Sequence, residues 1–178
     1  AGNLTESDIL SGNFNQSLDK VILPSSLQHL SFGESFNQSL DRVTLPATLV
    51  SLKFVVHQLY SICAFDHSLD AVVFPSGLQE LILYARFNQS LDNTSLPASL
   101  KTLGLSGDFN QSLESVTLPS SLQNLSFGFR FNQSLDNVTL PCCLETLRFG
   151  QDFNQSLDHV AFPSSLQKMV FKSRAYES

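Results

Sequence analysis

The side chains that could do chemistry recur in columns along this chain of 178 residues. One column is acidic, and two acids about 5 Å apart repel each other by roughly 1 kcal/mol in water. A cation site needs several converging oxygen ligands, whereas this column supplies one carboxylate per repeat. We therefore expect no metal site, but acids that face solvent and cap turns. Its seven members are Asp19, Asp41, Asp70, Asp92, Glu114, Asp136 and Asp158.

A second column consists of asparagines, each of which opens an Asn-Gln-Ser sequence of the type that accepts N-linked glycans. Glycans on successive turns about 4.8 Å apart would collide. We therefore interpret the column as an internal ladder, in which each amide forms hydrogen bonds with the turn of the neighbouring coil. We expect Asn110 to be buried. The column comprises Asn15, Asn37, Asn88, Asn110, Asn132 and Asn154.

No arrangement of catalytic or cofactor-binding residues is present in the sequence. The histidines lack the spacing of metal ligands, and the cysteines form neither a disulfide framework nor a CxxC zinc pair. No serine lies in a G-x-S-x-G motif, and no phosphate-binding glycine motif occurs. The sequence predicts a protein that is not an enzyme and has no cofactor. The residues in question are His29, His57, His67, His159, Cys63, Cys142 and Cys143.

These columns exist because the chain repeats one unit of 22 residues, with a single spacing of 29. The unit reads F-N-Q-S-L-D-x-V-x-L-P-x-x-L-x-x-L-x-F-G-x-x, and all seven prolines occupy one place in it. The V-x-L and L-x-F steps alternate with period two, which predicts two short strands per unit. Proline ends the first strand, and glycine often ends the second. The units open at Phe14, Phe36, Phe65, Phe87, Phe109, Phe131 and Phe153.

A single unit cannot hide its apolar side chains from water, but stacked units can. We predict a β-rich solenoid, a leucine-rich-repeat-like stack of seven coils of about 22 residues with short parallel strands. The solenoid forms one domain, 1–178. Within it, 1–13 is a degenerate part-repeat, 14–171 holds seven repeats with an insertion at 55–64, and 172–178 is a tail. The inward side chains of the first coil are Phe14, Leu18, Val21, Leu23, Leu27, Leu30 and Phe32.

The L-x-x-L-x-F core resembles the leucine-rich repeat consensus, and the whole unit more closely resembles the FNIP repeat. The likeness extends over residues 14–171 through F-N-Q-S-L, L-P, L-x-x-L and F-G. It departs at Ser17 and its equivalents, where the family often has proline. The resemblance implies a repeat solenoid with an interaction role, and it brings no catalytic residue or cofactor.

Composition narrows the classes of partner. The net charge is −6 and no Lys/Arg cluster occurs, which argues against nucleic acid and against a polybasic membrane anchor. No apolar run reaches the roughly 18 residues of a membrane-spanning helix. The chain opens at Ala1 without methionine, which indicates a processed form or a fragment. An odd number of cysteines, two of them adjacent, favours a reducing compartment, so we expect an intracellular or organellar location.

The insertion Val55–Ala64 interrupts the regular spacing, and it is apolar where tolerated loops are usually polar. Its candidate partner-binding residues are Val56, Leu59, Tyr60 and Ile62, since tyrosine and bulky apolar side chains often anchor interfaces. Two alternatives remain open, a passive loop or a loop that packs over its own solenoid.

The sequence therefore favours a non-catalytic module that binds or scaffolds proteins. The alternative is a structural subunit lodged in a larger assembly, such as an organellar or photosynthetic membrane complex of an alga or other protist. The missing start, which suits a removed transit peptide, and the lack of dedicated capping units favour that alternative.

Overall fold

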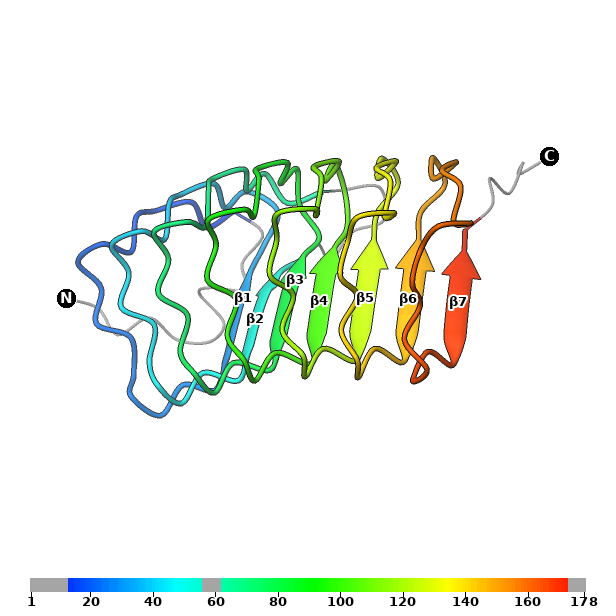
Figure 1. Cartoon of the computed structure of the whole chain (residues 1–178). Coiled ribbons are helices and arrows are strands. Elements are labelled where there is room, and N and C mark those ends of the chain that lie inside the picture. The colour runs from blue at the N-terminus through cyan, green and yellow to red at the C-terminus, as the bar shows by residue number, and fades with distance from the viewer. Residues whose placement is uncertain (1–12, 56–61, 173–178) are drawn as a thin grey trace.

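The computed structural model describes residues 13–55 and 62–172. One strand from each coil joins a seven-stranded parallel sheet, in which the strands lie in chain order (Figure 1). No helix in these ranges is long and apolar enough to span a membrane. The strands are β1 (His29–Phe32), β2 (Ser51–Phe54), β3 (Glu80–Leu83), β4 (Thr102–Leu105), β5 (Asn124–Phe127), β6 (Thr146–Phe149) and β7 (Lys168–Phe171).

The strand register places equivalent residues of successive units side by side. In β1 and β2, Leu30 lies opposite Leu52 and Phe32 lies opposite Phe54. Side chains of a strand point alternately to its two faces, so the Leu and Phe columns enter the core while the residues between them face outward. The predicted solenoid of short parallel strands is therefore confirmed.

The prediction of two strands per unit is wrong, because the V-x-L segments form no strand in the described coils. The phenylalanine rings that open the units stack 6.1 to 6.3 Å apart, as Phe14 on Phe36 and Phe36 on Phe65 do. These rings also pack against the phenylalanines of the strands, as Phe36 does on Phe32 at 3.9 Å, so both phenylalanine columns form one stack in the core.

Turns take over where the V-x-L segments end. In the first coil the backbone N–H of Leu27 donates to the carbonyl of Pro24 at 3.0 Å, and the equivalent bond closes the turn after every proline. Proline suits this place because it fixes its own backbone and has no N–H that a ladder would need. The chain is then directed into the strand that follows.

Candidate protein-interaction surface

The outward face of the sheet consists of two side chains from each strand. On the inward face every strand repeats the same types, Leu, Phe or Met. On the outward face the types differ from coil to coil. Its members are His29, Ser31, Ser51, Lys53, Glu80, Ile82, Thr102, Gly104, Asn124, Ser126, Thr146, Arg148, Lys168 and Val170. We call these residues the sheet face.

One ion pair links two strands of the sheet face. Lys53 Nζ lies 2.8 Å from a carboxylate oxygen of Glu80, which also accepts a hydrogen bond from the Ser51 hydroxyl at 2.8 Å. Burial raises the pKa of Glu80, but the hydrogen bonds from Lys53 and Ser51 outweigh it and hold the pKa below the ordinary glutamic acid value. The carboxylate is therefore kept charged and paired near the N-terminal end of the sheet.

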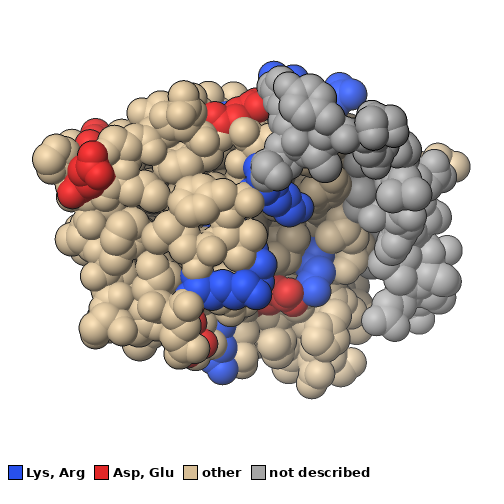
Figure 2. Space-filling model, turned by 90° about the vertical axis from the view of Figure 1, so that its right-hand side faces the viewer, with Lys and Arg blue, Asp and Glu red and all other residues tan. Residues whose placement is uncertain are grey.

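The other end of the sheet face carries unpaired positive charge. Arg148 in β6 and Lys168 in β7 are exposed, and neither forms an ion pair with any described residue. Figure 2 views the molecule from the side where β7 lies, and Lys and Arg side chains gather there around a hollow with a carboxylate at its floor. Three basic residues and one acid give the sheet face a charge of +2, whereas the whole chain carries −6.

The middle of the sheet face is formed by small residues and by Ile82, which covers Gly104. Gly104 in β4 has no side chain, and a Cβ placed there would meet Ile82 Cδ1 at 2.9 Å and Ser126 Oγ at 3.4 Å. Small residues thus line the centre, with Ile82 leaning over it. The sequence patterns did not predict this surface. Its residues vary from coil to coil, whereas the patterns consist of residues that repeat.

Of the insertion residues predicted to bind a partner, Val56, Leu59 and Tyr60 lie outside the described residues. Ile62 is half-buried, so it is not a freely exposed anchor. The two ends of the insertion are fixed, because Val55 N–H donates to the Phe32 carbonyl at 2.9 Å and Cys63 forms a parallel bridge with Ala85. The chain therefore leaves and rejoins the stack at the carboxyl ends of the strands.

The asparagine column carries a run of hydrogen bonds between coils. Each side-chain oxygen accepts the backbone N–H of the equivalent residue in the next coil, at 2.8 to 3.1 Å, and Asp66 takes the asparagine's place in the third coil. In most coils the next glutamine donates to the same oxygen, as Gln133 does to Asn110 at 3.0 Å. We call this run the asparagine ladder.

The expectation that Asn110 is buried is wrong, since it is half-buried and other members of the ladder are exposed. The ladder lies at the rim, where its amides serve turn N–H groups rather than fill the core. The acidic column is exposed in all seven coils. Its backbone N–H groups donate to the serine hydroxyl two residues earlier, as Asp136 does to Ser134 at 3.1 Å. Serine rather than the acid caps these turns.

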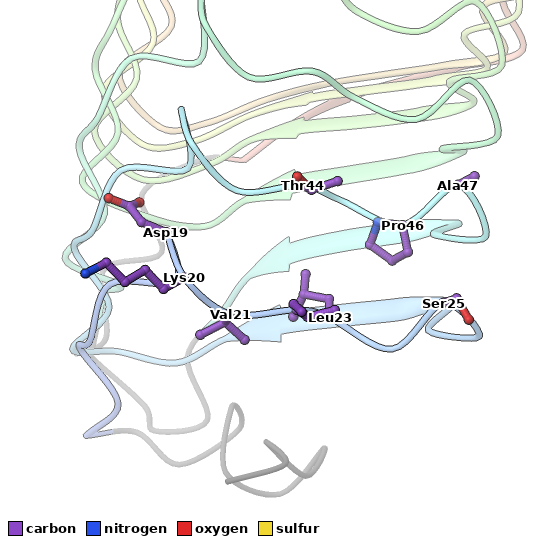
Figure 3. A pocket seen from close by; sticks show the side chains of 9 residues that line it. Asp19, Lys20, Val21, Leu23, Ser25, Thr44, Pro46 and Ala47 are labelled. Atoms are coloured by element: carbon purple, nitrogen blue, oxygen red, sulfur yellow. The ribbon is translucent and has the colours of Figure 1, made fainter. Parts of the chain in front are cut away.

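Figure 3 shows a groove between the first two coils, away from the strands. Asp19, Lys20, Ile22, Thr44 and Pro46 are among the residues that line it. Ile22 is 96% exposed, so the groove is shallow and open to solvent. Its polar groups do not converge on one point, and we assign it no ligand.

The other residues that could take part in chemistry do not gather at one site in the described ranges. Within the described ranges no group of three or more His, Cys, Asp or Glu could hold a metal ion. His67 Nε2 lies 3.1 Å from the Asn37 carbonyl and takes the place of the repeat glutamine. Cys63 is buried against the carbonyls of Gly33 and Phe36, and burial raises its pKa. His57 lies outside the described residues.

A single sheet of stacked parallel strands, one per repeat, defines the class of protein: a leucine-rich-repeat-like solenoid. The model of the FNIP repeat matches residues 14–55, 65–108, 109–152 and 131–173. The chain therefore belongs to the FNIP repeat family, as the sequence resemblance indicated.

One similar solved structure is the crystal structure of CroV588, described as "a novel circular LRR protein structure". Its TM-score is 0.71 at 36% sequence identity, over 84% of this chain. The match covers 21% of that chain, so the present chain spans about a fifth of its length. A search of curated proteins finds no match.

Proposed function

We propose that this chain is a non-catalytic protein-interaction module and that the sheet face is its contact surface. The supporting observation is the contrast between the two faces of one sheet. Core and turn positions repeat from coil to coil, whereas the sheet face varies in size and charge. Structural need accounts for the repetition, so the varied face is free to match a partner. Stacked repeats of this kind offer extended binding surfaces.

The charge of the sheet face indicates the kind of partner. Arg148 and Lys168 stand exposed on neighbouring strands of a protein whose other surfaces carry most of its carboxylates. A protein that presents carboxylates to β6 and β7 would be attracted here and repelled by the acidic column. A partner that lies over the centre of the sheet face would contact Ile82, whose side chain covers Gly104.

The test is charge reversal on the sheet face. We expect Arg148→Glu with Lys168→Glu to weaken binding of the native partner by at least about tenfold at low salt, and by less at high salt, because exposed charges are screened. The matched control is Lys20→Glu with Arg42→Glu, which changes the net charge equally beside the acidic column. The partner is found by purification from the native source, and the variants are then compared quantitatively. Equal loss in both double variants would refute the assignment of the surface.

The second candidate, a subunit within a larger assembly, is supported by the last coil. Phe171 in β7 is 53% exposed although its equivalents Phe32 and Phe54 are fully buried. An exposed apolar ring is unfavourable in water. This candidate predicts that the isolated chain associates through β7, and sedimentation of wild type against Phe171→Ser tests it. A monomer at high concentration would exclude it.

A further inference from the structure

The turn between the acidic column and β6 carries the two exposed cysteines, Cys142 and Cys143. Both are free thiols, and their sulfur atoms lie 3.9 Å apart. The N–H of Leu144 donates to the Pro141 carbonyl at 3.1 Å, so the two cysteines occupy the central places of a closed turn. The scaffold thus presents two thiols together to solvent.

The neighbouring coils show that neither sulfur is needed to hold the turn. Where Cys143 stands, other coils have hydroxyls that donate to carbonyls of the preceding coil, as Thr48, Ser99 and Ser121 do at 2.6 to 2.8 Å. Cys143 makes no such bond among the described residues, and its sulfur instead contacts Cys142. Three coils have Ser-Ser at this place, so the turn forms without cysteine.

A disulfide between the two is disfavoured. Neighbouring Cα atoms are about 3.8 Å apart across a trans peptide bond, whereas disulfides usually join Cα atoms about 4.4 to 6.8 Å apart. Every peptide bond in the described residues is trans. The pair is therefore expected to remain as two thiols and to be available as ligands.

We propose that Cys142 and Cys143 form a two-thiolate site for a soft divalent d10 metal ion of the zinc and cadmium type. Two sulfurs bound to a tetrahedral ion at about 2.3 Å would lie about 3.8 Å apart, and the observed separation is 3.9 Å. The thiols therefore need little movement to bind. Thiolates select such ions over the hard cations that prefer oxygen.

The site is open rather than closed. Two protein sulfurs occupy half of the tetrahedral positions, which leaves the others for water or for donors of a second molecule. Binding releases a proton from each thiol, so affinity rises with pH. The site does not depend on the proposed function of the sheet face.

The test is titration of the reduced full chain with Cd²⁺, followed by the ultraviolet charge-transfer band of thiolate-bound cadmium. We expect one ion per chain, with a band that grows as pH is raised. Cys142→Ser and Cys143→Ser should each lower the affinity by at least about tenfold and remove most of the band. Both variants restore a serine that other coils already carry, so the fold is expected to survive, which melting curves check.

The matched control is Cys63→Ser, which alters the buried thiol and leaves the turn intact. We expect its cadmium band and stoichiometry to equal those of the wild type. Survival of the band in either turn variant, or its loss in the control, would overturn the proposal. So would an ion shared by two chains, detected as dimers that sediment only when cadmium is present.

Discussion

The side-chain oxygen of Asn110 accepts a hydrogen bond of 2.9 Å from the backbone N–H of Asn132, one coil farther along the chain. The same oxygen accepts a second bond from Gln133. The asparagine ladder therefore ties each coil to the next at a place where no strand pairing does so. Asp66 shows that a carboxylate can occupy the place, since it accepts the N–H of Asn88 at 3.0 Å and the amide of Gln89 at 2.9 Å.

We expect Asn110→Ala to lower the free energy of unfolding by about 1–3 kcal/mol, because the N–H of Asn132 loses its acceptor. Asn110→Asp should cost less than Asn110→Ala, since the carboxylate keeps both bonds and Asn110 is only half-buried. If Asn110 were buried, the charge added by aspartate would lower the stability strongly. Because Asn110 is half-buried, we do not expect that loss.

Chemical denaturation of the three proteins measures these differences. Lys101→Ala is the control, because the Lys101 side chain is exposed and should change stability by no more than about 0.5 kcal/mol. An aspartate variant less stable than the alanine variant would contradict the hydrogen-bond argument.

The sequence could predict the solenoid because its signals are redundant. The phenylalanine that opens each unit, the proline and the L-x-F step all repeat at one spacing, and each of them independently fixes the coil. The asparagine ladder was also foreseeable, since an amide column needs partners and the next coil supplies them. Period-two patterning did not distinguish the strand from the V-x-L segment, because alternation reports which side chains face inward and not whether a neighbouring backbone is near enough to pair.

The sheet face could not be predicted as a surface. The repeat aligns His29, Glu80 and Lys168 in one column, but nothing in their types marks that column as a binding surface. The Cys142–Cys143 pair was visible in the sequence, but the spacing rules for zinc motifs do not cover adjacent cysteines. The sulfur separation and exposure come from the turn geometry.

Tyr60 in the insertion remains a predicted partner contact. Aromatic anchors often contribute strongly to interfaces, so we expect Tyr60→Ala to weaken partner binding by about 1–2 kcal/mol without changing the melting temperature. A pull-down and a melting curve on the same variant separate this result from its alternative. A lower melting temperature with intact binding would mean that the side chain packs on its own solenoid, and no change in either would show a passive loop.

Gly150 and Gly104 differ in what an added methyl group would meet, backbone at Gly150 and side chains at Gly104. We therefore expect opposite effects of alanine at the two positions. Gly150 follows β6 where the backbones of two coils meet, and a Cβ there would overlap the Gly128 carbonyl oxygen. Backbone cannot move aside cheaply, so we expect Gly150→Ala to destabilise by about 1–3 kcal/mol, the range of overpacked sites.

Gly104 is the matched comparison, because its Cβ would meet only side-chain atoms within van der Waals reach, nearest among them Ile82 Cδ1 at 2.9 Å. The end of the Ile82 side chain can turn away. In the interior of a strand, alanine is more stabilising than glycine by about 0.5–1 kcal/mol. Gly104→Ala should therefore be neutral or slightly stabilising in thermal and urea unfolding. If both alanine variants lost stability equally, Ile82 would be held in place as firmly as the backbone at Gly150, contrary to this argument.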